Sequence, residues 1–430
     1  MDDPRLGTIL LEGGIVEAAD LDRCLAIQTL TGGARPLGQI LLEQGLLDAA
    51  TLQRVLQLQR SEAALRAAQF PAADAQSGTL LRAARANGAS ELLVGEGRAV
   101  RIRVAGEWRE LAGEPVRGPE VWDFVRETMG AEVLEELADR QYVVRTWRDA
   151  ELGQGSAHAF RQFDGVSVRI TFAAERVLSP DDAGVPAPVV ELARGGRGLV
   201  LLVGERGIGR MDALAPLLQA ATADAGHYAI VLDDEPMPPL GTPAMLARRR
   251  FGLTTADRAA AVRGALREDP DVLTIADAGD PATFELAMRA AEGGRLVVAC
   301  MDAGSVTAAL HRILNFYPAY EVPRVRASLA AVLKAVLVRQ VLPDGDRTGT
   351  VVATELLVVD DAVRGALRRG ELGDLTLLLR MEGARCGHSL DRNMLDLLTA
   401  GRVRLEDVFA RAEEKAWLLE RTRDLQPTTR

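Results

Sequence analysis

The sequence predicts a multidomain α/β protein in which a helical tandem repeat precedes an α+β lobe and an α/β core. Three observations indicate this order. The first sixty residues repeat themselves, about one hundred residues of strand-like alternation follow, and an apolar run then leads into a glycine loop. The predicted segments are the repeat domain at 1–63, a linker at 64–77, the α+β lobe at 78–185 and the α/β core with C-terminal helices at 190–430.

Composition and charge exclude several classes of function. The net charge is −10 and the pI is about 5.2, which argues against non-specific binding to nucleic acid. The three cysteines, Cys24, Cys300 and Cys386, lie far apart, so the sequence predicts no zinc site or other metal site and a reducing compartment. No apolar run reaches the roughly 18–20 residues of a membrane span. We therefore expect a cytoplasmic protein, which a partner could hold at the inner membrane.

The repeat aligns residues 5–28 with residues 36–59. Each copy is predicted to form a short helix, a glycine turn and a second helix, with Gly14 and Gly45 as left-handed caps. Leu21 and Leu25 lie four residues apart and should share one helix face. Because one copy is too small to bury that face, we expect the two copies to pack together. On pattern alone this domain could also be a plain helical bundle for docking a protein.

The first copy has the pattern RLGxxLLxxGxVxxxxLxxxLxxQ, which resembles the MshE-type N-terminal domain of type II secretion and type IV pilus ATPases. The resemblance implies a site for cyclic di-GMP in some members, whereas other relatives use the fold to hold a protein. The second copy departs from the pattern, because Pro36 stands where Arg is expected and Arg35 comes one place earlier. The candidate ligand residues are Arg5, Leu6, Gly7, Leu10, Gly14, Leu21, Leu25, Gln28, Arg35, Leu37, Gly38, Leu41, Gly45, Leu52, Leu56 and Gln59.

The middle of the chain reads as an α+β lobe. Strand-like alternation occurs at 91–94, 100–104, 143–145 and 166–170, and a single helix is predicted at 120–137. This stretch has no concentrated set of catalytic residue types. Its lone His158 is therefore interpreted as structural or solvent-facing rather than as a ligand.

A glycine loop follows the apolar strand predicted at 198–203. Gly204, Gly207 and Gly209 have the spacing of a Walker A loop, GxxGxGK[ST], between a strand and a helix. Glycines let backbone N–H groups converge on a phosphate at a helix N-terminus. The pattern therefore predicts a P-loop core.

The side chains that a nucleotide needs are altered. Arg210 replaces the lysine that reaches the phosphates, and its forked group does not fit the same cradle. Met211 replaces the hydroxyl that holds Mg²⁺. Asp212 adds a carboxylate that would repel a triphosphate, and Pro216 should kink or shorten the helix. We expect weak or absent binding of Mg–ATP.

Further along, the chain resembles the motor ATPases of type II secretion and type IV pili. Residues 265–272, 280–283 and 290–294 are similar to the family's ALRxDPDxIL, RDxET and AAxTGH elements, and residues 362–368 to its AIRNLIR element. The resemblance covers 78–430, is closest to the pilus-retraction type and lacks the four-Cys insert of extension motors. It implies a PAS-like lobe, a RecA-like core with a helical C-terminal part, and a hexamer that hydrolyses ATP between lobes.

The family's catalytic positions are degenerate in this sequence. The acidic box corresponds to Asp233, Asp234 and Glu235, with the register uncertain by one residue. The Walker B glutamate corresponds to Asp277, whose carboxylate is one methylene shorter, and a misplacement of about 1 Å can cost roughly 10²-fold in rate. The family arginine of that element is Gly279 here. The two histidines of the His box are replaced by Arg295 and Asp302.

Two further features each leave two interpretations open. The run at 248–250 either faces phosphate or is a solvated basic face, and Asp269 and Asp271 either belong to the site or bracket a strand. The function predicted first is that of a pseudo-ATPase, which regulates or scaffolds a pilus or secretion system and is under cyclic di-GMP control. The alternatives are an active hexameric ATPase and a purely structural adaptor. The expected partners are further copies of the chain, a motor ATPase or an inner-membrane platform protein.

Overall fold

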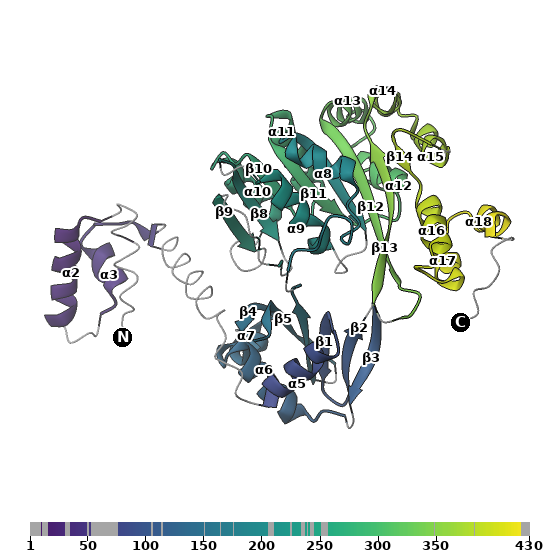
Figure 1. Cartoon of the computed structure of the whole chain (residues 1–430). Helices are drawn as coiled ribbons and strands as arrows, with labels where there is room; N and C mark the ends of the chain where they lie inside the picture. Colours follow the sequence, from purple (N-terminus) through teal and green to yellow (C-terminus); the bar gives the residue numbers. More distant parts are fainter. Residues whose placement is uncertain are drawn as a thin grey trace. The chain divides into compact units, whose positions relative to one another are not determined.

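The protein forms two compact units, Met1–Gln69 and Phe70–Arg430, and each is described by itself. The architecture is that of a computed structural model, drawn in Figure 1. The residues that it describes are 10, 16–30, 35–49, 51–52, 76–104, 106–112, 115–149, 151–163, 165–174, 176–204, 210–223, 226–233, 237–238, 240, 245–250, 257–347, 349–381 and 383–422.

The first unit buries one apolar cluster between the two sequence repeats. Its described helices are α2 (Ala18–Leu30) and α3 (Leu37–Glu43). The cluster joins Leu21 and Cys24 of the first copy to Ile40 and Leu41 of the second. Gly45, just after α3, has a φ of +69°, the left-handed conformation that glycine adopts without strain. The expected packing of the two copies and the cap at Gly45 are thus confirmed.

The second unit begins with a lobe built on an antiparallel sheet. The strands lie in the order β3-β2-β1-β6-β5-β4, and one face of the sheet packs against three helices around a common apolar cluster. The elements are α5 (Gln76–Ala86), β1 (Glu91–Gly95), β2 (Val100–Val104), β3 (Glu107–Ala112), α6 (Gly118–Met129), α7 (Glu132–Asp139), β4 (Tyr142–Asp149), β5 (Gly153–Gln162) and β6 (Gly165–Phe172).

The lobe differs from the sequence expectation in two ways. The helix predicted at 120–137 is two helices, because Gly130 between α6 and α7 has a φ of +93°. A right-handed helix cannot pass through that conformation. Strands β3 and β5 were not predicted, since their sequences, EWRELA and GQGSAHAFRQ, are rich in polar and small residues. They form because neighbouring strands complete their backbone hydrogen bonds.

The core is a mixed sheet in the order β14-β13-β12-β7-β11-β10-β8-β9. Its middle strands are parallel and almost wholly apolar, as expected for strands covered on both faces. The strands are β7 (Gly198–Gly204), β8 (Tyr228–Asp233), β9 (Met245–Arg250), β10 (Val272–Ile275), β11 (Leu296–Met301), β12 (Leu333–Pro343), β13 (Thr350–Val358) and β14 (Gly387–His388).

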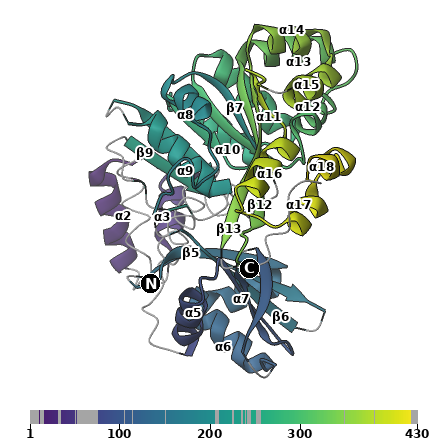
Figure 2. The same cartoon turned by 45° about the vertical axis from the view of Figure 1, so that its right-hand side comes forward.

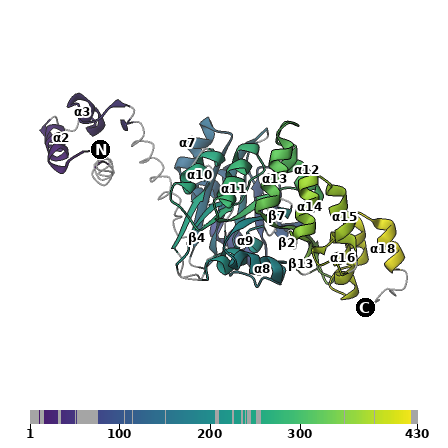
Figure 3. The same ribbon diagram turned by 90° about the horizontal axis from the view of Figure 1, so that it is seen from above.

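Helices cover both faces of this sheet, and Figure 3 shows α8 and α9 on one side and α10, α11 and α13 on the other. Two separate apolar clusters fill these layers. Helices α16–α18 pack on the outer part of β12 and β13 around a third cluster. The helices are α8 (Ala187–Arg194), α9 (Arg210–Ala221), α10 (Arg258–Leu266), α11 (Pro281–Glu292), α12 (Val306–Leu314), α13 (Val322–Val332), α14 (Asp361–Arg369), α15 (Leu372–Arg380), α16 (Leu390–Thr399), α17 (Leu405–Arg411) and α18 (Lys415–Thr422).

Helix α9 continues through Pro216, so the expected shortening of this helix is wrong. A proline inside a helix costs about 3 kcal/mol. The neighbouring side chains Ala213, Leu214, Leu217 and Leu218 are all buried against the sheet. Their burial outweighs the cost, because about 1.5–3 kcal/mol comes from each buried leucine.

Candidate functional site

The carboxyl ends of four neighbouring parallel strands meet at one edge of the core sheet. β7 ends at Gly204 and β8 at Asp233, while Asp277 and Asp302 follow β10 and β11 closely. In parallel sheets the ligand site lies at this edge. The topology therefore brings the glycine loop, the acidic box, the Walker B position and one His-box position to the same place.

The beginning of the glycine loop is pressed against the next strand. A Cβ on Gly204 would lie 2.7 Å from the backbone oxygen of Arg339 on β12, so only glycine fits this position. Gly207 and Gly209 lie outside the described residues. Arg210 begins α9, but its side chain also lies outside the described part.

The first turn of α9 carries an internal carboxylate. Met211 is buried, with 5% of its surface exposed. Burial raises the pKa of Asp212, and the nearby guanidinium of Arg339 partly offsets this effect. Burial likewise lowers the pKa of Arg339 to about 10, opposed by Asp212. The opposite charges of Asp212 and Arg339 therefore act on each other beside the loop.

The acid that ends β8 is bound to an arginine of the adjacent strand. Asp233 is 1% exposed, and Arg248 on β9 donates to its Oδ2 from Nε at 3.2 Å and from Nη2 at 2.5 Å. A two-pronged pair of this kind is stronger than a single contact. Asp234 and Glu235, the other members of the acidic box, lie outside the described residues.

The Walker B position is also occupied by an ion pair. Asp277 is 7% exposed, and Nη2 of Arg258 on α10 lies 3.1 Å from its Oδ2. Its other oxygen accepts a hydrogen bond from the backbone N–H of Gly279 at 3.0 Å. Both oxygens of this carboxylate therefore face donors of the protein.

A second arginine fills the space beside Gly279, where the resembled family has an arginine. A Cβ on Gly279 would lie 3.4 Å from Nη2 of Arg312 on α12. The Nη1 group of Arg312 donates to the backbone oxygen of Asp302 at 2.9 Å. A guanidinium is therefore present at this place, although it comes from a different part of the chain.

The other His-box position lies at the opposite edge of the sheet. Arg295 precedes β11 and pairs with Asp269, which has a φ of +52°. Asp271 accepts a hydrogen bond from the backbone N–H of Tyr228 at 2.8 Å. Both aspartates thus bracket strands at the amino edge of the sheet, and of the two interpretations the structural one holds.

Sequence reasoning missed the arginines that hold the acids. Arg248 binds Asp233 and Arg249 binds Glu268, while the side chain of Arg250 lies outside the described part, so both interpretations of the basic run stay predictions. Arg258 and Arg312 come from helices with no recognisable motif. The only available signal was an excess of arginine in segments that follow the acidic box.

Several candidate residues of the N-terminal unit are structural in the described part. Leu10, Leu21, Leu37 and Leu41 are buried, whereas Leu25 is 39% exposed, because α2 turns Cys24 inward instead. The remaining candidates with described contacts or exposure are Gln28, Arg35, Gly38, Gly45 and Leu52. Arg5, Leu6, Gly7, Gly14, Leu56 and Gln59 lie outside the described residues.

One polar link joins the two copies. The side-chain amide of Gln28 donates to the backbone oxygen of Arg35 at 3.3 Å. The guanidinium of Arg35 is paired with Glu43 on α3. A Cβ at Gly38 would lie 2.9 Å from Cδ1 of Leu52, so a larger residue there would make the Leu52 side chain shift. The guanidinium of Arg35, the candidate phosphate ligand, is therefore already paired with the carboxylate of Glu43.

Two features are absent from the described residues. None of their helices combines the length and the apolar character that crossing a bilayer requires. No group of three or more His, Cys, Asp or Glu residues among them is arranged to hold a metal ion.

Comparison with known proteins matches this geometry to one family. The model of the type II/IV secretion system protein family matches residues 160–409, from β5 to α17. A twitching motility protein of Neisseria gonorrhoeae is 26% identical over 313 residues, covering 73% of this chain and 84% of that protein. The type IV pilus retraction ATPase PilT of Pseudomonas aeruginosa is 25% identical over 342 residues, covering 78% and 97%.

The fold is shared with a solved motor. The crystal structure of the pilus retraction motor PilT with bound ADP superposes with a TM-score of 0.68 at 25% identity. The superposition covers 79% of this chain and 98% of that one. The lobe and the core together therefore correspond to a whole chain of that motor.

Proposed function

Since the chain belongs to the type II/IV secretion system protein family, we propose that it is a pseudo-ATPase with a regulatory or scaffolding role in a type IV pilus or type II secretion-like system. It would hydrolyse ATP weakly or not at all. Its contribution would come from binding to partners through the motor fold.

The observation that carries this proposal is that the acids at the end of β8 and at the Walker B position are each bound to an arginine. Asp233 is held by Arg248 and Asp277 by Arg258. A carboxylate that positions a metal-bound water must be available to that water or its metal. A guanidinium at 2.5–3.1 Å occupies this place and already neutralises the charge.

The residues present do not fit magnesium and a triphosphate. Magnesium in P-loop sites is held by a hydroxyl oxygen, and the thioether of Met211 is buried and offers no hard ligand. The helix N-terminus, which would attract phosphate, has the carboxylate of Asp212 in its first turn instead. We derive no catalytic step through ATP at this site.

The partners that we propose follow from the family. The chain would assemble with further copies of itself in a hexamer-like ring, or with an active motor ATPase or an inner-membrane platform protein. The relatives named a twitching motility protein and a type IV pilus retraction ATPase support this assignment, because the similarity covers most of their length. We place the protein in the cytoplasm, peripheral to the inner membrane.

We further propose that the first unit senses cyclic di-GMP, with Arg5 and Arg35 as candidate phosphate ligands. The repeat packs as one bundle, and Arg35 lies where the two copies meet. If the ligand does not bind, the same bundle serves to dock a protein. These outcomes leave the proposal for the core unchanged.

Equilibrium dialysis of the purified full chain with labelled ATP and labelled cyclic di-GMP tests both proposals. We expect no Mg-dependent retention of ATP and saturable retention of cyclic di-GMP. Magnesium-dependent ATP retention with turnover would contradict the proposal for the core. The Arg210→Lys, Met211→Thr and Asp277→Glu variant, made in one chain, asks whether these side chains alone account for the loss of ATP binding.

An active ATPase of the pilus-retraction type is the second candidate, and one observation favours it. Arg312 supplies a guanidinium beside Gly279, so the missing family arginine is replaced in space. An active enzyme would need Asp277 to leave Arg258 during turnover. Hydrolysis that is abolished in the Asp277→Ala variant would establish this function.

A further inference from the structure

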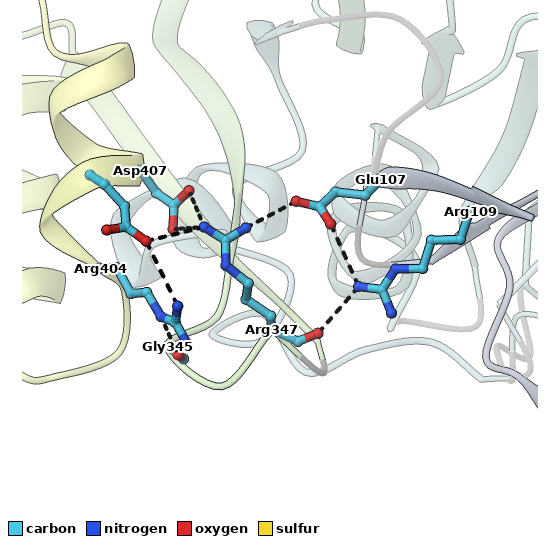
Figure 4. Close-up of polar contacts among 7 residues, drawn as sticks. Glu107, Arg109, Gly345, Arg347, Arg404 and Asp407 are labelled. Carbon is cyan, nitrogen blue, oxygen red and sulfur yellow. Dashed lines mark hydrogen bonds and ion pairs between the residues drawn. The ribbon is translucent and has the colours of Figure 1, made fainter. Parts of the chain in front are cut away.

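Arg347 joins the lobe to the C-terminal helices through three carboxylates. It lies in the turn between β12 and β13, and Figure 4 shows its guanidinium between Glu107 and Asp407. Nη1 lies 3.0 Å from Glu107 of β3, and Nη2 lies 3.3 Å from Glu406 and 3.2 Å from Asp407 of α17. One side chain therefore bridges segments that are far apart in the sequence.

The backbone around Arg347 is built to present this side chain. Its φ of +58° is left-handed, which costs a non-glycine residue roughly 1–2 kcal/mol. Its N–H donates to the backbone oxygen of Asp344 at 3.1 Å, which closes the turn. Arg404 fixes the turn from the other side by donating from Nε to the backbone oxygen of Gly345 at 2.7 Å.

The lobe contributes a second contact on the same strand. Nη2 of Arg109 reaches the backbone oxygen of Arg347 at 3.5 Å and lies 3.6 Å from Glu107. The outer end of the β12–β13 hairpin approaches β3 in Figure 1, and Figure 2 shows β12 and β13 running down to the lobe. The turn is thus held by charges of β3 and α17 together.

Burial of apolar side chains does not fix the lobe on the core. In the described part of the chain, each buried apolar cluster draws its members either from the lobe's elements α5 to β6 or from the residues that follow β6, and residues 177–185, which the sequence assigned to the lobe, pack on the core. Polar contacts across the boundary include Arg347 with Glu107, Arg109 with the oxygen of Arg347, and Gln154 with the oxygen of Met237. An interface without a shared apolar cluster allows domains to move unless polar contacts hold them.

We propose that Arg347 is an ionic latch that holds the lobe in one orientation on the core. The latch closes when Glu107 of the lobe joins Glu406 and Asp407 on the same guanidinium. The turn that holds Arg347 follows β12, and β12 also carries Arg339 beside Gly204. The latch is therefore attached to the strand that borders the glycine loop. Loss of the lobe's carboxylate opens the latch and frees the lobe.

Distance measurement between two spin labels on the full chain tests this inference. The labels are placed by Asp139→Cys on α7 and Glu292→Cys on α11, both exposed, while the three native cysteines are buried. The labelled chain with Glu107 and Arg347 unchanged should give a narrow distribution of label-to-label distances. Glu107→Arg places a positive charge against Arg347 and should give a broader distribution shifted in its mean.

A matched control lies on the same strand. Glu110 of β3 pairs within the lobe, with Arg101 at 3.5 Å, so Glu110→Arg should leave the distribution narrow. High salt, about 1 M, should broaden the distribution of the unmodified chain, because exposed ion pairs are screened. A Glu107→Arg chain as narrow as the unmodified one, or a Glu110→Arg chain equally broad, would overturn the latch.

Discussion

Arg258 and Asp277 form an ion pair across the candidate site, with Nη2 of the arginine 3.1 Å from Oδ2 of the aspartate. The two residues come from α10 and from the end of β10, and Asp277 is almost completely buried. The acid at the Walker B position therefore has its counter-charge inside the protein. This relationship predicts how the site responds when either member is changed.

Removing the arginine should destabilise the core. Arg258→Ala removes the guanidinium from a buried carboxylate, and we expect about 1–2 kcal/mol lower free energy of unfolding, since the arginine is itself partly exposed. Arg263→Ala on the same helix removes only an exposed pair with Asp257 and should cost under about 0.5 kcal/mol. Urea unfolding of both variants measures the difference. Equal losses in the free energy of unfolding would show that the Arg258–Asp277 pair contributes no more than an exposed ion pair.

Asp212 and Arg339 should be energetically coupled. Arg339 is buried and Asp212 is partly buried, so replacing one leaves the other without a nearby opposite charge. The losses of stability in Asp212→Leu and in Arg339→Met should add up to more than the loss in the double variant. The difference, the coupling energy, should be about 1–3 kcal/mol. A double-mutant cycle by urea unfolding gives this coupling. Additive effects would mean that the two charges do not interact.

The stability of the core should depend on pH through Glu355. This residue lies on β13, is 7% exposed and accepts a hydrogen bond from the backbone N–H of Val306 at 2.9 Å. Burial, with Glu413 and Asp391 nearby, raises its pKa to about 7, although the N–H of Val306 and Arg380 act in the opposite direction. In the unfolded chain the ordinary value is near 4.5.

The direction of this dependence follows from proton binding. Between about pH 4.5 and pH 7 the folded chain holds a proton that the unfolded chain has lost, so this residue's contribution falls as pH rises, by roughly 3 kcal/mol in total. Glu355→Gln should therefore gain stability relative to the unmodified chain at pH 8 but not at pH 5. Unfolding curves at both pH values measure this. If the difference in stability between Glu355→Gln and the unmodified chain is the same at both pH values, the raised pKa of Glu355 is excluded.

The proposed cyclic di-GMP site predicts an effect of Glu43. Its carboxylate is paired with Arg35, so Glu43→Gln should free that guanidinium and tighten binding of the anionic ligand about 5-fold to 10-fold. Arg5→Ala with Leu10→Ala should abolish binding, but Leu10 is fully buried, so this pair also tests the packing of the bundle. Asp20→Asn, which breaks an exposed pair with Arg23, is the control. Titration calorimetry that finds no change in any variant would remove the ligand hypothesis.

The sequence predicts the core better than its site. The core strands depend on local sequence pattern, whereas the site depends on contacts between residues that are distant in the sequence. The strands β7, β10 and β11 are buried on both faces and therefore read as continuous apolar runs. The glycine spacing and the acids at the strand ends are also local patterns, so they predict which edge of the sheet holds the site. The family resemblance then places both in one known fold.

The arginines that complete the site could not be located in this way. Arg258 binds Asp277 nineteen residues away and Arg248 binds Asp233 fifteen residues away, through side chains whose partners are chosen by tertiary packing. Gly130 shows the same limit at the level of a helix, because the periodic pattern continues across a break that depends on one backbone angle. Arg347 reaches Glu107 across 240 residues, with no sequence signal.

The most direct test of the account is ATP turnover by the purified, unmodified chain in the presence of magnesium, compared with its Asp277→Ala variant. The account predicts that both preparations hydrolyse ATP at the same background rate, because Asp277 is engaged by Arg258 and the loop lacks its lysine and hydroxyl. Rapid hydrolysis by the unmodified chain, lost in the variant, would contradict it.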